Sequence, residues 1–529
     1  MSHAAHIGQW VPAAAARQGD KRALRAGDGD FDYAALARLV DGVEGALVAA
    51  GVGPGARERE RAVVAWLGTN SAAMLATLFA CARRGVIFMP LNWRLAPPEH
   101  RAQLAAVAPA LFIIDGEFVA ACHEQQVAPP ATRCIARSTA APAGWTGWEA
   151  FLAGGRAGAN GQSKHAAATP DPEAPVLLCF TSGATGTPKG ALLSARALAA
   201  NADAADDMHG LVAGDHVLTT LPLFHVGGLN IQTLPALRRG CTVTLHAKFD
   251  AEATFDALER DGITLTVLVP AQLEVLLAHP RWASAAFNHL RSISTGSTIV
   301  PRRLIDAVHA RGVPLIQVWG ATETGPVVCC LHADEAHARA GSAGRAAVGA
   351  ELRIADAAGN TLPNGADGAS GEVLVRAPQL MSGYWRDAAG TAQALAGGWF
   401  RSGDAGHLDA DGYLWIDGRL KDMIICGGEN VSPAEVEAVL LECPEVAEAA
   451  VIGRPDARWG EAVVAFVVPK EGTRPDSAQL LERFAGRLAR FKHPRELIFV
   501  ETLPRTALGK VQKDALRQLV AGRSQGPRA

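Results

Sequence analysis

The sequence predicts an α/β protein with largely parallel sheets, and three observations support that expectation. Short apolar, β-branched runs alternate with amphipathic stretches along most of the chain, which is typical of parallel sheets covered by helices. The chain has 529 residues, which corresponds to about three or four domain-sized units and excludes a single small binding module. Hydrophobic residues make up 49% and charged residues 19%, which excludes disorder as the main state.

The first expected elements lie in an apolar stretch. Between Arg61 and Arg83 the chain has no charged residue, but Gly-Thr-Asn-Ser at 68–71 interrupts it. A membrane span would need about 20 apolar residues without such a break. We therefore expect a strand over 62–67 and a helix over 72–82 that begins after an Asn-Ser cap.

The central part is expected to alternate between buried strands and helices. The expected strands are 176–180, 217–221, 263–269 and 314–319. The expected helices are 271–278 and 301–310, the second with proline at its first position. The segments 154–175 and 360–370 are rich in Gly, Ala, Pro and polar residues and are expected to be irregular connections, the second of them in a β subdomain around 351–376.

The last hundred or so residues are expected to form a unit of their own. Ser-Pro-Ala-Glu at 432–435 has the pattern of a capping box. Strands are expected over 446–452 and 463–468, and a helix over 480–488. A boundary near 418–422 divides the chain into an N-terminal domain, 1–418, and a C-terminal domain, 419–529.

The net charge and the cysteine pattern limit which binding partners and which cellular compartment are expected. The net charge is −3, which argues against nucleic acid or an anionic membrane as the main partner. The nine cysteines are irregularly spaced without a CxxC pair, which is typical of reduced thiols. The first ten residues lack the pattern of a signal peptide. We expect a soluble, cytoplasmic protein without stable membrane insertion.

A glycine-rich loop follows the strand expected at 176–180. Residues 181–190 read Thr-Ser-Gly-Ala-Thr-Gly-Thr-Pro-Lys-Gly. Glycines let backbone N–H groups turn toward an anion, hydroxyls add donors and the lysine adds positive charge. The Walker A pattern of Gly-Lys followed by Ser or Thr is absent. We expect a phosphate-binding loop of another kind, with the candidate ligands Thr181, Ser182, Gly183, Thr185, Gly186, Thr187 and Lys189.

This loop resembles the phosphate-loop signature of the acyl-adenylate-forming (AMP-binding, ANL) superfamily, which includes acyl-CoA synthetases, adenylation domains of peptide synthetases and beetle luciferases. Ala184 departs from the pattern, since the family usually has Ser or Thr there. Further motifs in the family's order extend to residue 510, and 91–95 is also similar, so the resemblance covers essentially the whole chain. It implies a large N-terminal domain of stacked α/β sheets with a β subdomain, and a small mobile α+β C-terminal domain.

The resemblance implies roles for residues before position 330. In Leu-Pro-Leu-Phe-His-Val-Gly-Gly at 221–228, His225 would gate the acid. Gly296 and Ser297 would line the adenine. In Trp-Gly-Ala-Thr-Glu-Thr at 319–324, the aromatic Trp319, which replaces the more usual Tyr, and Gly320 would lie near the adenine, Thr322 would touch the α-phosphate and Glu323 would hold Mg²⁺.

Later motifs of the same resemblance supply the ribose contacts, the pivot and the catalytic lysine. In Arg-Ser-Gly-Asp-Ala-Gly at 401–406, Asp404 would hold the ribose hydroxyls. In Gly-Arg-Leu-Lys-Asp at 418–422, Arg419 would contact the ribose and Lys421 would be the pivot between the domains. Gly427 and Gly428 would line the tunnel for the pantetheine of CoA. In Pro-Arg-Thr-Ala-Leu-Gly-Lys at 504–510, Lys510 would be catalytic.

The implied activity is that of an ATP-dependent acid–CoA ligase. A carboxylic acid and ATP give acyl-AMP and pyrophosphate, and CoA then gives acyl-CoA and AMP. Lys510, Mg²⁺ on Glu323 and the loop donors would offset the repulsion between the acid and the triphosphate. The acid is itself the nucleophile, which agrees with the absence of a Gly-x-Ser-x-Gly elbow.

Several alternatives stay open at this point. Because few residues follow Lys510, CoA is the expected acceptor, with a stand-alone adenylation enzyme that loads a carrier-protein thiol as the alternative. A non-catalytic nucleotide-binding homologue and a luciferase-like oxidation share the same motifs. The apolar segment around 225–231, with paired glycines, suits a medium-chain fatty acid or an aryl acid. Arg238 and Arg239 are expected at an exposed helix end. The expected state is a monomer or homodimer.

Overall fold

The computed structural model describes residues 6–55, 61–162, 171–181, 188–297, 299–365, 370–426, 429–456, 459–485, 487–488, 490–506 and 509–523. By its internal contacts the chain divides into two compact units. Unit 1 comprises Met1–Leu352 and Val375–Arg401, and unit 2 comprises Arg353–Leu374 and Ser402–Ala529. The contacts thus group the β subdomain with the C-terminal residues. The division at residue 418 that the sequence suggests stays a prediction.

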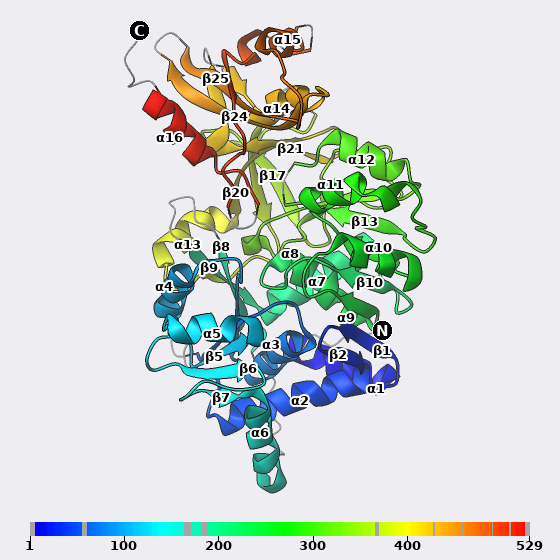
Figure 1. Ribbon diagram of the computed structural model, residues 1–529, viewed down its shortest axis with the longest axis vertical. Coiled ribbons are helices and arrows are strands. Elements are labelled where there is room, and N and C mark those ends of the chain that lie inside the picture. The colour runs from blue at the N-terminus through cyan, green and yellow to red at the C-terminus, as the bar shows by residue number, and fades with distance from the viewer. Residues whose placement is uncertain are drawn as a thin grey trace. The chain divides into compact units, whose positions relative to one another are not determined.

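Unit 1 contains two large sheets, both mostly parallel (Figure 1). One has eight strands in the order β19 (Gly383–Tyr384), β9 (Lys189–Ser194), β8 (Pro175–Thr181), β4 (Ile87–Leu91), β3 (Val63–Leu67), β5 (Leu111–Asp115), β6 (Arg133–Arg137) and β7 (Thr146–Gly147). The other has nine in the order β16 (Arg345–Ala346), β15 (Cys329–Cys330), β14 (Leu315–Trp319), β13 (Ser292–Thr295), β12 (Leu265–Val267), β10 (His216–Thr219), β11 (Thr242–Leu245), β1 (Arg22–Ala26) and β2 (Gly29–Asp32).

Helices cover both sheets and share a core with them. They are α1 (Trp10–Gln18), α2 (Tyr33–Ala49), α3 (Ala72–Arg84), α4 (Pro97–Val107), α5 (Gly116–Glu124), α6 (Trp148–Gln162), α7 (Ala195–His209), α8 (Val226–Gly228), α9 (Leu234–Arg239), α10 (Ala251–Arg260), α11 (Pro270–Ala278), α12 (Arg302–His309) and α13 (Ala388–Ala394). The largest core cluster contains residues of α3 together with residues of both sheets. The expected stacked α/β architecture is therefore present.

The apolar stretch near residue 70 forms a strand and a buried helix, as expected. The Ser71 hydroxyl caps α3 by accepting a hydrogen bond from the backbone N–H of Met74 over 3.2 Å. Residues Ala72 to Ala82 of this helix are all buried inside the protein. Within the described ranges, no helix is both long enough and apolar enough to cross a membrane.

Most of the expected central elements are present, and two expectations were wrong. The segment expected to be irregular from residue 154 continues α6 to Gln162. The physical reason is close helix packing, because a Cβ on Gly155 would lie 2.4 Å from the backbone nitrogen of Ala46 in α2. Pro301 was expected at the first position of the helix over 301–310, but it is the N-cap residue of α12.

Unit 2 contains two smaller sheets. The four-stranded sheet has the order β17 (Glu351–Ala355), β18 (Gly371–Arg376), β20 (Phe400–Leu408) and β21 (Leu414–Arg419). The second has the order β23 (Glu429–Val431), β22 (Ile424–Cys426), β25 (Gly460–Pro469) and β24 (Val446–Asp456), with β26 (Glu496–Phe499) paired to β25. Its helices are α14 (Pro433–Leu441), α15 (Ser477–Glu482) and α16 (Lys513–Arg523).

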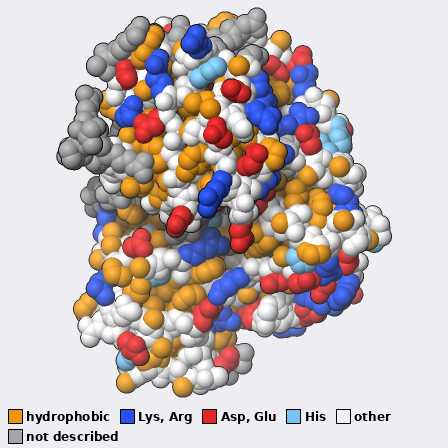
Figure 2. Space-filling view, turned by 45° about the horizontal axis from the view of Figure 1, so that its top comes forward, with side chains coloured by type: hydrophobic (Ala, Val, Ile, Leu, Met, Phe, Trp, Pro, Cys, Tyr) orange, Lys and Arg blue, Asp and Glu red, His pale blue; other side chains and the backbone are white. Residues whose placement is uncertain are grey.

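Two local expectations for the C-terminal residues were wrong. The Ser432 hydroxyl donates to the carbonyl oxygen of Asp417 instead of capping α14, and the Glu435 carboxylate pairs with Lys492. The helix expected over 480–488 ends at Glu482. On the face that Figure 2 presents, basic and acidic side chains are interspersed, in keeping with the small net charge.

Candidate active site

The loop after β14 presents a carboxylate at the edge of the nine-stranded sheet. Glu323 lies half-buried in the 3-10 turn η5 (Thr322–Thr324), beside the buried Thr322. Gly320 passes so close to the following chain that a Cβ there would lie 1.8 Å from the carbonyl oxygen of Pro326. Only glycine fits at that position, so the tight turn that carries Glu323 depends on it.

Glu323 connects the two sheets of unit 1. Its Oε1 atom accepts a hydrogen bond from the Tyr384 hydroxyl over 2.9 Å, and the Thr181 hydroxyl lies 3.4 Å from the same atom. Thr181 ends β8 and Tyr384 ends β19, so both hydroxyls come from the eight-stranded sheet. The structure therefore brings Thr181 and Glu323 together, as the sequence suggested.

The donor set around Glu323 fits a magnesium ion that arrives with a phosphate ligand. Mg²⁺ is usually held by one or two carboxylates together with substrate phosphates and water. Among the described residues, the hydrogen bonds to this carboxylate reach Oε1, so Oε2 would be the Glu323 oxygen for a cation. Among the residues that the structure describes, no group of three or more His, Cys, Asp or Glu could hold a metal by itself.

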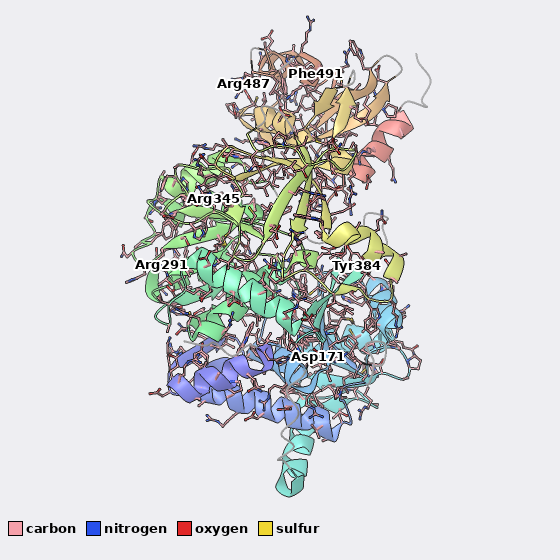
Figure 3. The ribbon with its side chains drawn as sticks, turned by 180° about the vertical axis from the view of Figure 1, so that it is seen from behind. Asp171, Arg291, Arg345, Tyr384, Arg487 and Phe491 are labelled. Atoms are coloured by element: carbon pink, nitrogen blue, oxygen red, sulfur yellow. The ribbon has the colours of Figure 1, made fainter. Side chains whose placement is uncertain are left out.

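Lys189 and Tyr384 line a hollow next to this carboxylate. Lys189 Nζ lies 3.0 Å from Asp387 Oδ2 and 4.9 Å from the centre of the Tyr384 ring. Burial and the negative charge of Glu323 raise the pKa of the Tyr384 phenol, which therefore remains a donor at neutral pH. The hollow measures about 300 Å³, and Phe180 and Trp385 also line it. Figure 3 labels Tyr384, near α13.

The glycine-rich loop joins β8 to β9 as a hairpin connection. Thr181 and Lys189 are paired residues of these two antiparallel strands, so the structure fixes both ends of the loop. The expected phosphate ligands between them lie outside the described residues. Their contact with phosphate stays a prediction for Ser182, Gly183, Thr185, Gly186 and Thr187.

The expected adenine-lining residues meet at the carboxyl ends of two parallel strands. Gly296 follows β13, and Trp319 ends the neighbouring β14. A Cβ on Gly296 would lie 2.5 Å from the carbonyl oxygen of Val318, so the two chain segments touch at this point. Ser297 has a positive φ of 70°, which turns the chain away from the strand. Trp319 is half-buried at this edge.

The expected acid segment is tied to the Glu323 loop. The Asn230 side chain donates a hydrogen bond over 2.7 Å to the carbonyl oxygen of Gly325, two residues after Glu323. Within the segment, Gly227 N–H donates to His225 Nδ1 over 3.0 Å, so a neutral His225 carries its proton on Nε2. A Cβ on Gly228 would lie 2.3 Å from the carbonyl oxygen of Pro222, which requires glycine.

The two arginines near this segment are engaged elsewhere. Arg238 lies 2.7 Å from Asp203, and Arg239 lies 3.3 Å from Asp206. Both pairs join α9 to α7. Each arginine is therefore compensated by a carboxylate of the protein and is not required to meet a second carboxylate of the acid.

Unit 2 carries the expected ribose residues as a cross-strand pair. Asp404 of β20 and Arg419 of β21 are directly opposite each other, and Arg419 Nε lies 2.7 Å from Asp404 Oδ1. Arg419 Nη1 also donates to the carbonyl oxygen of Ser402 over 3.2 Å. The arginine therefore fixes the orientation of the carboxylate.

Lys421 and Lys510 also belong to unit 2. Lys421 is in the 3-10 turn η7 (Leu420–Asp422), and its Nζ lies 3.8 Å from Asp514 Oδ2. Lys510 is exposed, and its backbone N–H donates to the Thr506 hydroxyl over 3.2 Å. The last two expected residues lie outside the described part of the chain, so the thiol tunnel stays a prediction for Gly427 and Gly428.

Sequence reasoning missed Tyr384 and Asp387. Tyr384 bonds to Glu323 across 61 positions of sequence, and a contact at that distance leaves no local pattern. One signal was available, since Tyr384 is one of only three tyrosines in the chain. Asp387 could not be recognised as the partner of Lys189 until the pairing of β19 with β9 placed them together.

Comparison with known proteins agrees with this geometry. The sequence model of the AMP-binding enzyme matches residues 11–385, and that of the AMP-binding enzyme C-terminal domain matches 435–510. The chain therefore belongs to the AMP-binding enzyme family. It is an AMP-forming enzyme of the acid–thiol ligase class.

Relatives and solved structures cover nearly the whole chain. An indoleacetate–CoA ligase of Aromatoleum aromaticum is 52% identical, over 97% of this chain and 98% of its own. A feruloyl-CoA synthase of Amycolatopsis is 39% identical over 97% and 98%. The structure of an anthranilate–CoA ligase with anthranoyl-AMP superposes with a TM-score of 0.87 and 27% identity, and covers 98% of each chain.

Proposed function

We propose that the chain is an aryl-acid–CoA ligase whose substrate is an arylacetic acid of the indoleacetate type. The observation that carries the proposal is the 52% identity to an indoleacetate–CoA ligase over 97% of this chain. The acid segment supports it, because the side chains that it buries are mostly apolar. Its paired glycines do not add space, since a Cβ on Gly228 would meet the carbonyl oxygen of Pro222. Arg238 and Arg239 are already paired, which disfavours a dicarboxylate.

The first half-reaction must bring two anions together. A carboxylate oxygen of the acid attacks the α-phosphorus of ATP, and the bond from that phosphorus to pyrophosphate breaks. Lys510 would supply positive charge to the phosphate in this step, and Thr322 would donate a hydrogen bond to it. Mg²⁺ held by Glu323 would supply Lewis acidity on the phosphate oxygens.

The second half-reaction needs a thiol at the same acyl carbon. The sulfur of CoA attacks the carbonyl carbon, and AMP leaves with the bonding electrons. Asp404 and Arg419 would hold the ribose through both steps. The turn at Lys421 would let the C-terminal residues exchange Lys510 for the segment of Gly427 and Gly428.

The acceptor and the compartment are further parts of the proposal. A fatty acid–[acyl-carrier-protein] ligase of Streptomyces coeruleorubidus is 36% identical over 93% of this chain, so a carrier thiol is the second candidate. The nine cysteines of the chain are all free and buried, which favours a reducing compartment such as the cytoplasm. A monomer or homodimer remains the expected state.

A substrate panel tests the proposal. Purified protein is incubated with ATP, Mg²⁺, CoA and one acid at a time, and AMP and acyl-CoA are measured. The panel contains indole-3-acetate, phenylacetate, ferulate, benzoate, octanoate and malonate. We expect kcat/KM to be highest for an arylacetate and AMP formation to require CoA. Preference for octanoate or ferulate would overturn the acid class, and product formed only with a carrier protein would overturn the acceptor.

A further inference from the structure

A small buried cavity lies beneath the expected acid segment. It measures about 10 Å³, which is about the space that one water molecule or one small polar group needs. It lies where β10, α8 and the π-helix η3 (Leu229–Thr233) meet, and its lining includes Gly227 and Gly228. Single turns of π-helix are rare and occur frequently at functional sites. The polar side chains that line the cavity are Thr219, Gln232 and Thr233.

A series of hydrogen bonds fixes the orientation of the Gln232 amide. His209 Nδ1 lies 2.7 Å from the carbonyl oxygen of Ala205, so it must carry the proton. Burial lowers the pKa of His209 to about 4, so at neutral pH the other ring nitrogen is an acceptor. Ser294 Oγ lies 2.9 Å from that nitrogen, Nε2, and therefore donates its only hydrogen there.

The orientation of the Gln232 amide follows from this arrangement. Because the hydrogen of Ser294 is used, the group of Gln232 that lies 3.3 Å from Ser294 Oγ must be the donor, Nε2. The amide oxygen, Oε1, therefore points away from Ser294 Oγ. Gln232 is only 2% exposed, and its Oε1 has no hydrogen-bond partner among the described residues. A buried acceptor without a partner is costly, so this atom requires a donor.

A second, independent series of hydrogen bonds leaves the Thr219 hydroxyl as an acceptor. Thr233 Oγ1 lies 2.6 Å from the carbonyl oxygen of Gly228 and must donate to it. Thr219 Oγ1 lies 2.7 Å from Thr233 Oγ1, so Thr219 is the donor of that pair. Both threonine hydrogens are therefore used. Apart from the second N–H of Gln232 Nε2, the polar side chains of the cavity offer lone pairs, and its other lining residues are apolar or glycine.

We propose that Gln232 is a specificity-determining residue, whose Oε1 accepts a hydrogen bond from a ring N–H or O–H of the acid. The inference rests on the proposed function, since it takes the segment of His225 to Gly228 as the wall of the acid pocket. A ring with a donor satisfies Oε1. An isosteric ring without one leaves that buried acceptor unpaired in the complex, and such a mismatch can cost a large factor in kcat/KM.

Matched acids test this directly in the wild-type protein. Indole-3-acetate and 1-benzofuran-3-acetate have nearly the same shape, but the second has a ring oxygen in place of the N–H. We expect wild-type kcat/KM to be about 10- to 100-fold higher for the indole acid. Equal use of both acids would overturn the inference and leave the proposed function standing, because it would mean that a bound water satisfies Oε1. Turnover of neither acid would overturn both.

A variant assigns the preference to one side chain. Gln232→Met keeps the length of the side chain and removes the acceptor, so the ratio between the two acids should fall to about one. The matched control is Gln317→Met, a buried glutamine of β14 whose Nε2 donates to the Ser342 carbonyl oxygen over 2.7 Å. The control should keep the wild-type ratio. A preference that survives Gln232→Met would overturn the assignment to Gln232, and Ser294→Ala, which frees the amide to turn, gives a second variant if Gln232→Met fails to fold.

Discussion

The phenol hydroxyl of Tyr384 donates a hydrogen bond to Oε1 of Glu323 over 2.9 Å. This bond joins β19, an edge strand of the eight-stranded sheet, to the loop that follows β14 of the nine-stranded sheet. In the part of the chain that the structure describes, the hydrogen bonds to this carboxylate reach Oε1, so Oε2 would be the oxygen that binds a cation. Glu323 is therefore held in a fixed orientation before any nucleotide arrives, which reduces the reorganisation that binding requires.

Removal of this bond should weaken catalysis without unfolding the protein. Tyr384→Phe keeps the ring over which Lys189 lies and removes only the donor. A hydrogen bond to a charged group contributes about 1.5–3 kcal/mol, so we expect at least about a tenfold loss in adenylation and a higher Mg²⁺ requirement. Pyrophosphate release against Mg²⁺ concentration measures both. Tyr413→Phe is the matched control, and an unchanged Mg²⁺ curve for Tyr384→Phe would contradict the role given to this bond.

Loss of the Glu323 charge should reduce the rate of adenylation more than loss of the Tyr384 hydrogen bond does. Glu323→Gln keeps the shape and the ability to accept from Tyr384, but it removes the negative charge that a divalent cation needs. We expect adenylation to fall by about 100-fold or more, because the ion and the charge that it offsets act in the transition state. Acid-dependent pyrophosphate release measures the effect. Glu351→Gln, which alters a glutamate paired with Arg376, should leave the rate unchanged.

The two half-reactions should separate when Lys510 is removed. Lys510→Ala should abolish formation of acyl-AMP and largely spare formation of the thioester from supplied acyl-AMP. The reason is that this cation is needed where charge develops on the α-phosphate, and it is not needed when the thiol attacks. The control is Lys470→Ala, an exposed lysine at the end of β25. Equal loss of both half-reactions would rule out the assigned role.

A proline at position 421 should slow thioester formation and spare the formation of acyl-AMP. Lys421→Pro restricts φ within the turn Leu420–Asp422, so the C-terminal residues should be hindered in changing their position. We expect acyl-AMP formation to continue while thioester formation slows, as measured by single-turnover assays of each step. Lys421→Ala is the control, since the Lys421–Asp514 pair is largely exposed and contributes little. An overall rate unchanged by the proline would argue against a pivot here.

The buried His209 should make stability depend on pH. Its pKa is about 4 in the folded chain and 6.5 in the unfolded chain, so unfolding takes up a proton between these values. The free energy of unfolding is therefore fully available above about pH 6.5 and decreases as the pH falls toward 4, by about 2 kcal/mol between pH 7 and pH 5. Urea titrations at both pH values measure this. His209→Gln should reduce the decrease, and an unaltered pH dependence would exclude His209 as its source.

Those parts of the fold that depend on short local sequence patterns could be predicted from the sequence. Ser71 as a helix cap, the strand that ends at Thr181 and the tight turn of Gly320 are all local, and the structure has each of them. The family motifs also place Glu323 next to Thr181, although 142 positions separate the two residues. Motifs succeed here because each marks the end of a strand, and the sheets bring those ends together.

Two of the wrong expectations have a physical origin in contacts between elements. Gly155 is helical because α6 needs close approach to α2, and a glycine-rich sequence gives no sign of that. Ser432 has the sequence of a cap, but the carbonyl of Asp417 in β21 is a competing acceptor. Gln232 was not noticed at all, because a buried amide is recognisable only when the groups that surround it are known.

The burial of all nine cysteines has a chemical consequence for an enzyme of this class. An acyl-adenylate reacts with any accessible thiolate, so a protein that makes one risks acylating itself. Cys179 lies on β8, with its sulfur 4.0 Å from the Phe224 carbonyl of the acid segment, and burial raises its pKa to about 12. At neutral pH only about one such thiol in 10⁵ is ionised. The chain is thereby protected from its own product, and the thiol that reacts must be supplied from solution.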